Sequence, residues 1–428
     1  MRRILFFSLL ITGALPAQQV PQATDLPGKP FFINATWYIG GAGNWDYLTM
    51  DPSAGRLYIA HGTAMQVVDV ESGTLAGEIG GFYEARQVAL DNTGELGYVS
   101  DGGLGKVIVF DRQTLKKISE IDTGANPRSL VFDSLTSLLF VVRANPPAEG
   151  ASSEPVGRRA GTRDAQPSER STEPGNTTRG VESVVTVIDT QTQTVLGDIH
   201  LPGLLGYAVE DSNSEIYLSV TDRNQVFHFN AQTVAPLLRP QPSAGAPVAT
   251  AAPEAAKPSV SPRINLDWTR PHPSSSGDGR LRVYLLSPEC IDPRALAMDS
   301  THMRLFAACN NRTLLVLNTG TGEKVTALPI GPGVDAVGYD AEHGFLFTAN
   351  GAAEGSLTII RQDVTDTYAV IQTLPTRQRA STLAVNPKTG AVYMVTDYHG
   401  VDLSKPGGIG TLEQTPITGS FQVLQVSN

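Results

Sequence analysis

The chain is a succession of short apolar runs separated by polar turns, and the same order of runs returns several times. In the first copy a run ends at Asp51, a small turn follows, and a second run, RLYIAH, ends ten residues after the acid. The runs are too short for amphipathic helices, and their alternation of apolar and polar positions is typical of β-strands. The segments that end at the equivalent position are WDYLTMD, ARQVALD, PRSLVFD, LGYAVED, PRALAMD, VDAVGYD and ASTLAVN.

The residues that close these segments serve as markers of the repeat: Asp51, Asp91, Asp133, Asp211, Asp299, Asp340 and Asn386. In every copy the second run ends ten residues beyond the marker, so we expect this hairpin to carry no insertions. A third run and usually a fourth follow. Four short antiparallel strands in a unit of about 40 residues predict a propeller blade, because one such sheet cannot bury both faces without neighbours.

The sequence therefore predicts an all-β protein, a seven-bladed β-propeller of four-stranded antiparallel blades, as a single domain over residues 31–428. At its start, WYIGG (Trp37 to Gly41) is an outer strand without a blade, and near its end FQVLQV is a third strand without a fourth. Pairing these N- and C-terminal strands in one blade would close the ring and remove an exposed edge. The alternative, two domains in tandem, leaves both strands unpaired.

Two intervals between markers are longer than the others. The excess falls at about 146–181 and at about 236–281, in stretches rich in Pro, Ser, Gly and Ala. Such composition with little apolar periodicity predicts disordered insertions rather than domains. Within the second stretch, INLDW is a candidate for local docking.

Residues 1–17 have the features of a secretory signal peptide: two arginines, a short apolar run, and small residues before an expected cleavage after Ala17. Residues 18–30 are then an N-terminal linker. No cysteine follows the apolar run, so no lipid anchor is expected, and no later run approaches the ~20 apolar residues of a membrane span. We expect a soluble monomer in the periplasm or outside the cell.

Composition agrees with a turn-rich globular protein, with 42 Gly, 29 Pro and 17% charged residues. The formal net charge of -10 disfavours binding to nucleic acid or to anionic membranes. The strand pairs GRLYIAH…VVDVESG, GAVYMVTD and RLFAACNNRTLLVLNTGTGEKVTALPIG resemble the YVTN-type, YncE-like secreted β-propellers. That resemblance implies a seven-bladed, secreted binding propeller more than an enzyme. The chain lacks the Gly-His and Trp-Asp pairs of WD repeats in register.

Propellers place ligands at the mouth of the central channel, and the constant register identifies candidate residues there. Five residues before the markers lie Asp46, Arg86, Arg128, Gly206, Arg294, Asp335 and Ser381, and ten after them lie His61, Asp101, Arg143, Thr221, Cys309, Asn350 and Thr396. The two sets are expected to face one another across each hairpin. Asp46 with His61, and Arg86 with Asp101, are then ordinary cross-strand pairs, and Arg294 could reach Asp335.

The third blade differs, because this register opposes Arg128 to Arg143, and like charges repel unless an anion joins them. One hypothesis is that both arginines, with Tyr207, hold a small anion or an acidic group of a ligand. The alternative is that they extend into solvent or pair with an acid of the adjacent insertion.

The two cysteines, Cys290 and Cys309, fall on this same face and are expected to form a disulfide in an oxidising compartment. The histidines do not cluster, and haem-attachment, phosphate-loop, serine-hydrolase and zinc-protease motifs are absent from the sequence, so we expect no cofactor and no metal. The leading hypothesis is a non-enzymatic module that binds a partner protein, a glycan or a small anionic ligand at the channel mouth. The alternative is a hydrolase or isomerase of a sugar acid or lactone, by fold analogy alone.

Overall fold

The computed structural model describes residues 29–41, 43–143, 181–238, 263–265, 281–401 and 414–428. The signal peptide, nearly all of the linker and most of both insertions lie outside the described residues, so these remain predictions. Within the described residues no helix is long and apolar enough to cross a membrane.

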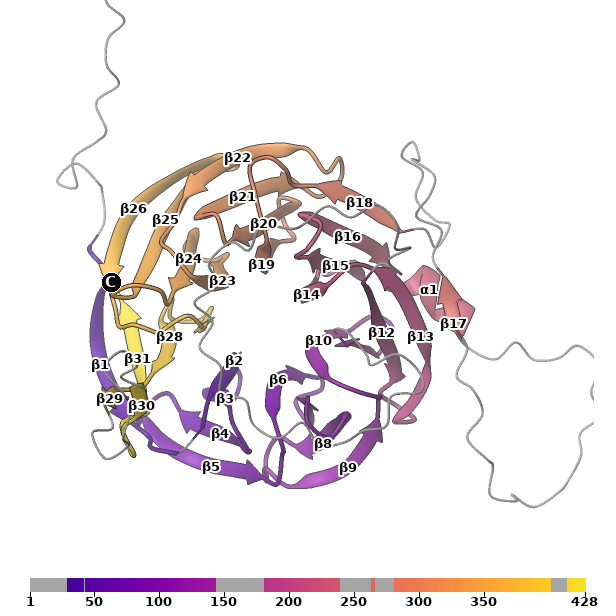
Figure 1. Ribbon diagram of the computed structural model, residues 1–428, viewed down its shortest axis with the longest axis horizontal. Helices are drawn as coiled ribbons and strands as arrows, with labels where there is room; N and C mark the ends of the chain where they lie inside the picture. The colour runs from indigo at the N-terminus through magenta and orange to yellow at the C-terminus, as the bar shows by residue number, and fades with distance from the viewer. Residues whose placement is uncertain (1–28, 42, 144–180, 239–262, 266–280, 402–413) are drawn as a thin grey trace, which may run out of the picture.

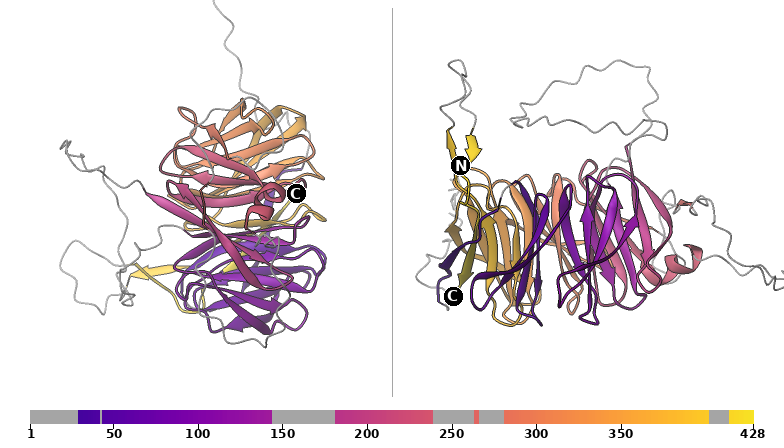
Figure 2. Two further views of the ribbon diagram at one scale, coloured as in Figure 1. Left: turned by 90° about the vertical axis from the view of Figure 1, so that its right-hand side faces the viewer. Right: turned by 90° about the horizontal axis from the view of Figure 1, so that it is seen from below.

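Seven antiparallel sheets stand as blades around a central channel and form a disc (Figures 1 and 2). Blade 1 contains β2 (Trp45–Asp51), β3 (Arg56–His61), β4 (Ala64–Asp69) and β5 (Thr74–Gly80), and blade 2 contains β6 (Ala85–Leu90), β7 (Leu96–Asp101), β8 (Lys106–Asp111) and β9 (Lys117–Asp122). Blade 3 contains β10 (Pro127–Asp133), β11 (Leu138–Arg143), β12 (Glu182–Asp189) and β13 (Thr194–Pro202). Blade 4 contains β14 (Leu205–Glu210), β15 (Glu215–Val220), β16 (Gln225–Asn230) and β18 (Arg282–Leu285).

Blade 5 contains β19 (Pro293–Asp299), β20 (Arg304–Cys309), β21 (Thr313–Asn318) and β22 (Lys324–Pro329), and blade 6 contains β23 (Val334–Asp340), β24 (Phe345–Asn350), β25 (Ser356–Val364) and β26 (Thr367–Pro375). Blade 7 contains β27 (Leu383–Val385), β28 (Val392–Thr396), β31 (Gln422–Ser427) and β1 (Phe32–Tyr38). The predicted fold class is confirmed.

The two ends of the described chain close the ring. Strand β1 pairs antiparallel with β31, with Trp37 opposite Val423, and β31 also pairs with β28. The outer strand was expected at 37–41 but ends at Tyr38, because Gly40 and Gly41 adopt positive φ angles of 67° and 108° that a strand cannot continue through. Blade 7 is therefore built from both ends, which leaves no unpaired seam.

Three short elements are added to the blades. Helix α1 (Ala231–Leu238) follows β16, so residues 236–238 of the expected insertion are helical. Strand β17 (Arg263–Asn265) pairs in parallel with β13, and it contains the first two residues of INLDW, while the other three lie outside the described residues. Strands β29 (His399–Val401) and β30 (Gln414–Pro416) form a hairpin that projects from one face of the disc (Figure 2).

The core lies between the blades. Among the described residues there are seven hydrophobic clusters, and each joins two neighbouring blades. The cluster that seals the ring packs Leu57 and Ile59 of blade 1 against Tyr393 and Val423 of blade 7. Since each fully buried large apolar side chain contributes about 1.5–3 kcal/mol, every blade depends on both of its neighbours.

The recurring acidic marker has a structural role at the end of the innermost strand. Asp51 Oδ1 accepts hydrogen bonds from the backbone N–H groups of Ser53 and Ala54 at 3.0 and 3.1 Å. Asn386 Oδ1 accepts one from Lys388 in the same way, at 3.1 Å. A short side-chain acceptor is needed to fix this turn, which explains why the marker is always Asp or Asn.

Candidate functional site

A register shift interrupts the innermost hairpin of blades 1 to 6. In blade 3, for example, Pro127 is paired with Arg143 but Ser129 is paired with Val142, so Arg128 is the additional residue of a β-bulge. The residue five before the marker falls in this irregular stretch in all six blades: Asp46, Arg86, Arg128, Gly206, Arg294 and Asp335. A bulged residue has no partner on the next strand, so its side chain can turn towards the channel.

The bulge corrects the cross-strand pairs expected from the sequence. Arg128 does not face Arg143, because the additional residue shifts the register by one. The Arg143 guanidinium is instead buried and makes an ion pair of 2.9 Å with Asp198 on β13 of its own blade. Arg143 is therefore neutralised within blade 3 and does not share a site with Arg128.

The pairs expected in blades 1 and 2 are wrong for the same reason. His61 is paired with Trp45 and Asp101 with Ala85. The buried His61 ring packs on Phe421, with ring centroids 3.9 Å apart, and is part of the core.

Arg86 joins two blades at the channel. Its guanidinium contacts Asp46 of blade 1 at 2.9 Å and Glu84 of its own blade at 2.6 Å. Burial raises the pKa of Asp46, although the charge and hydrogen bond of Arg86 oppose the rise. In blade 5, Arg294 pairs with Asp292 at 2.9 Å rather than with Asp335.

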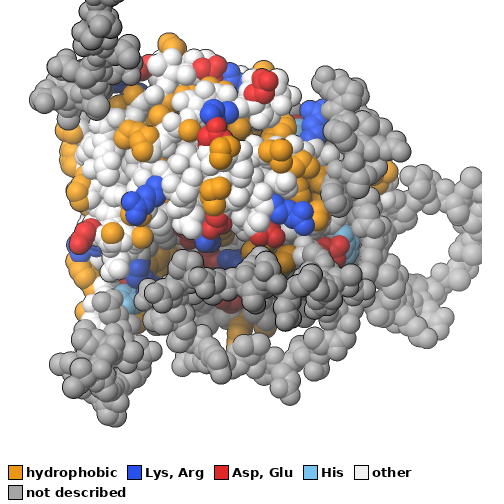
Figure 3. Space-filling model, turned by 45° about the horizontal axis from the view of Figure 1, so that its top comes forward, with side chains coloured by type: hydrophobic (Ala, Val, Ile, Leu, Met, Phe, Trp, Pro, Cys, Tyr) orange, Lys and Arg blue, Asp and Glu red, His pale blue; other side chains and the backbone are white. Residues whose placement is uncertain are grey.

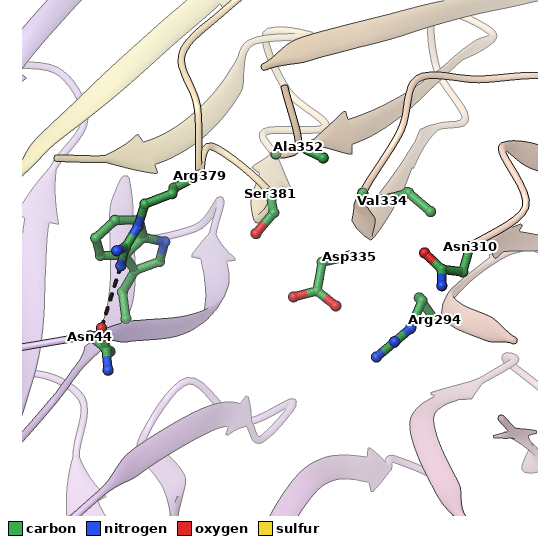
Figure 4. A pocket seen from close by; sticks show the side chains of 11 residues that line it. Asn44, Arg294, Asn310, Val334, Asp335, Ala352, Arg379 and Ser381 are labelled. Atoms are coloured by element: carbon green, nitrogen blue, oxygen red, sulfur yellow. Dashed lines mark hydrogen bonds between the residues drawn. The ribbon is translucent and has the colours of Figure 1, made fainter. Parts of the chain in front are cut away.

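A pocket of about 460 Å³ opens at the channel mouth between blades 5, 6, 7 and 1 (Figure 4). Its polar and aromatic lining is Asn44, Trp45, Arg294, Asn310, Asp335, Arg379 and Ser381. The Arg379 guanidinium lies 4.7 Å from the centroid of the Trp45 ring and 3.7 Å from Asp397 Oδ1. Arg379 is thus held in place on one wall, while Arg294 lies on the other side of Asp335 (Figure 4).

Asp335 is the acid of this pocket. Burial raises its pKa to about 6, and the carboxylate of Asp46 adds to the rise, while Arg294 and Arg128 oppose it. A carboxyl group with such a pKa can give or take a proton near neutral pH. The bulges of blades 1, 3, 5 and 6 therefore bring charged groups of both signs within electrostatic reach of one another.

Two tyrosines meet inside the channel. Tyr47 on β2 and Tyr207 on β14 have ring centroids 5.2 Å apart in an edge-to-face arrangement. Burial raises the pKa of Tyr207 to about 12, and burial together with Asp46 and Asp335 raises that of Tyr47 well above its ordinary value. Both phenols are therefore uncharged hydrogen-bond donors at neutral pH.

Several of these site residues were not predicted from the sequence. Tyr47 could have been found, because it lies four positions before its marker as Tyr207 does. Asn44 and Arg379 lie in loops that enter blades 1 and 7, outside the repeat, and no spacing in the sequence points to them.

Cys290, in the loop that enters blade 5, and Cys309, at the end of β20, form a disulfide with Cα atoms 5.4 Å apart. Both are fully buried next to the channel mouth. Among the described residues, no group of three or more His, Cys, Asp or Glu side chains is placed to hold a metal ion.

The part of the surface that Figure 3 shows offers less than the channel mouth. On the face that Figure 3 shows, basic, acidic and hydrophobic side chains are scattered singly rather than gathered into a patch. Isolated surface groups of this kind need no functional explanation. The convergence of charged side chains makes the channel mouth the better candidate site.

Comparison with known proteins supports the fold alone. No family model matches the chain, and no curated protein matches its sequence. A chain of the mitotic checkpoint complex is similar with a TM-score of 0.57 and 12% identity, covering 90% of this chain and 96% of that one. U3-55K has a TM-score of 0.58 and 8% identity over 92% and 98% of the two chains, and the RRP9 WD40 repeats have 0.58 and 8% over 93% and 97%. The protein therefore has a WD40-like seven-bladed propeller fold.

Proposed function

We propose that the protein is a binding module that holds a small acidic ligand in the channel-mouth pocket. The observation that carries this proposal is that Arg294 and Arg379 line one pocket on either side of Asp335. Guanidinium groups bind carboxylates through charge-assisted hydrogen bonds, and here their number exceeds that of the lining carboxylates. The pocket is the size of an ordinary small-molecule site.

The remaining lining groups favour a ligand with hydroxyl groups. Asn44, Asn310 and Ser381 offer amide and hydroxyl partners, and Trp45 provides an aromatic wall. A carboxylate-bearing polyol of the uronate type would use both the guanidinium and the neutral polar groups. A neutral glycan would add no ionic contact to the pairs that Arg294 forms with Asp292 and Arg379 with Asp397. A protein partner would present an Asp or Glu side chain to the arginines.

Titration calorimetry of the full chain with galacturonate and with galactose tests this proposal. We expect galacturonate to bind and galactose, which lacks the carboxylate, to bind at least about tenfold more weakly. Arg294→Gln should weaken galacturonate binding by a similar factor. Arg312→Gln is the matched control, because Arg312 is exposed close by after β20 and does not line the pocket. Equal binding of the two sugars, or equal effects of the two variants, would contradict the proposal.

An enzyme is the second candidate, and Asp335 is the observation that favours it. A carboxyl group with a pKa of about 6 in a pocket with two arginines could act as a general acid or base on a sugar acid or lactone. Incubation of the protein with aldonolactones and uronates, followed by NMR, tests this function. Product formation by the parent protein that is lost in Asp335→Asn would show that the site is catalytic, and the binding-module proposal would then be replaced by an enzyme.

Location and family are further parts of the proposal. The first 17 residues support secretion, and the strand-pair sequences support membership of the YVTN-type, YncE-like group. Expression in a bacterial host with mass analysis of the exported protein tests the location. We expect a monomer that begins at Gln18, and a cytoplasmic protein that retains Met1 would contradict it.

A further inference from the structure

The edge-to-face contact of Tyr47 and Tyr207 crosses the channel. Tyr47 belongs to the innermost strand of blade 1 and Tyr207 to that of blade 4. In a ring of seven blades these two lie on opposite sides, as β2 and β14 do in Figure 1. Side chains that meet at 5.2 Å from such positions must span the channel.

The hydroxyl groups of the two tyrosines are available to bind a ligand. In the part of the chain that the structure describes, neither tyrosine hydroxyl has a protein hydrogen-bond partner, although both rings are half-buried. Arg128 is similar, since its exposed guanidinium makes no ion pair with any described residue. It is nevertheless close enough to Tyr47, Asp46 and Asp335 to lower the pKa of each. Two hydroxyl donors and a free cation therefore converge on one region of the channel.

This region adjoins the mouth pocket through Asp335. The carboxyl group of Asp335 lines the pocket and is within electrostatic reach of both Arg294 and Arg128. It also influences the Tyr47 phenol. A ligand in the pocket could therefore extend past Asp335 towards the tyrosines without leaving protein contact.

We propose that Tyr47, Tyr207 and Arg128 form a second subsite, inside the channel, for an additional acidic group of the same ligand. This inference rests on the proposed function and narrows its ligand to an acidic oligosaccharide with at least two uronate units. The chemistry is complementary, because a carboxylate accepts hydrogen bonds from hydroxyl groups and pairs with a guanidinium. One unit occupies the pocket at Arg294 and Arg379, and the next lies against the tyrosines.

Calorimetric titration with galacturonate and digalacturonate tests the second subsite. We expect the dimer to bind at least about tenfold more tightly than the monomer, because the second carboxylate binds at high effective concentration. The double variant Tyr47→Phe/Tyr207→Phe keeps both rings but removes the hydroxyls, and Arg128→Gln removes the charge. Each should abolish most of the dimer's advantage, and the tyrosine double variant should leave monomer affinity unchanged. Tyr83→Phe, at an exposed tyrosine of blade 2, is the matched control.

A spectroscopic readout separates a ligand contact from a structural effect. Digalacturonate should perturb the near-ultraviolet absorption of the tyrosines in the parent protein and not in the double variant, while circular dichroism shows both proteins folded. Equal affinity for monomer and dimer, with monomer binding still dependent on Arg294, would overturn the second subsite and leave the proposed function standing. Absence of binding by either ligand would remove both.

Discussion

The main chain of Phe31 and the side chain of Gln372 exchange two hydrogen bonds across the ring closure. The Phe31 N–H donates to Gln372 Oε1 at 2.9 Å, and Gln372 Nε2 donates to the Phe31 carbonyl oxygen at 2.7 Å. The Phe31 ring is buried beside Phe345 and Phe347, with centroids 5.1 and 5.5 Å away. The N-terminal segment is thus fastened to blade 6 as well as to blade 7.

Gln372→Ala should therefore loosen the N-terminal segment. We expect the free energy of unfolding to fall by about 1–2 kcal/mol, because the variant leaves main-chain groups of Phe31 without a partner. Denaturant unfolding measures the change. Gln113→Ala, at an exposed turn position, should have no measurable effect, and a similar loss in both variants would contradict the fastening role.

Arg112 is a buried cation on the opposite face of the disc. It bridges Asp51 of blade 1 at 2.5 Å and Asp91 of blade 2 at 3.2 Å, and all three side chains are nearly inaccessible. Arg112→Met should lower the free energy of unfolding by about 3–5 kcal/mol, because it leaves a buried carboxylate uncompensated. Lys106→Ala, which removes a more exposed pair with Glu120, should change stability little. Thermal unfolding of the two variants compares them.

The ion pair of Arg112 and Asp51 also predicts how the free energy of unfolding depends on pH. Burial alone would raise the pKa of Asp51, but hydrogen bonds from Arg112 and from the Ala54 and Ser53 N–H groups bring it below its ordinary value. A carboxyl group with a lowered folded-state pKa stabilises the fold above its unfolded-state pKa of about 3.9. We expect this contribution to be lost as the pH falls from about 4 through the lower folded-state value. An Arg112→Met protein should lose less stability over that range than the parent.

Ligand affinity should depend on pH through Asp335. Above its pKa of about 6 the group is negative and repels an acidic ligand, whereas below it the group is neutral and can donate a hydrogen bond. The charged groups that face it are Asp46, Arg294, Arg128 and Asp292. Galacturonate affinity should rise about threefold to tenfold between about pH 7.5 and about pH 5.5, a range in which the ligand remains charged. Asp335→Asn should flatten this dependence, and an unchanged slope in that variant would refute the assignment.

The disulfide should contribute to stability under oxidising conditions. It joins residues 19 positions apart in the chain, and closing a loop of that length stabilises a fold by about 3 kcal/mol in the chain-entropy model. Cys290→Ala/Cys309→Ala should lower the unfolding midpoint of the oxidised protein. Reducing agent should lower the midpoint of the parent and have no effect on the double variant. A parent protein insensitive to reductant would show that the bond does not form in solution.

Most of the fold could be predicted from the repeat, because each marker side chain accepts hydrogen bonds that fix the turn after the innermost strand. Constant spacing from Asp51 to Asn386 was enough to place the innermost hairpins, and Trp37 identified the strand that closes the ring. A β-bulge leaves no trace in that spacing, so the register at Arg128 and Arg143 was wrong by one residue. Of the three residues of the predicted anion site, Arg143 belongs to an ion pair with Asp198 and Tyr207 contacts Tyr47, and the anion site itself remains a prediction.

The remaining contacts of the site join different blades, and these side chains come close together only when the ring is closed. Tyr47 contacts Tyr207 because blades 1 and 4 face each other, a relation that no local pattern encodes. Arg379 lies over Trp45 because blade 7 meets blade 1 at the closure. Of these four residues, only Arg379 lies in a loop outside the repeat, where no spacing in the sequence pointed to it.

The position of β31 between β28 and β1 has a consequence during synthesis. Strand β1 leaves the ribosome first among the blades' strands but has no sheet to join until residues 422–427 have been made. Until then blade 1 lacks the complete neighbour that covers one of its hydrophobic faces. A hydrophobic face of blade 1 therefore stays incompletely covered during elongation, and we expect a premature stop before Gln422 to yield an open arc rather than a smaller propeller.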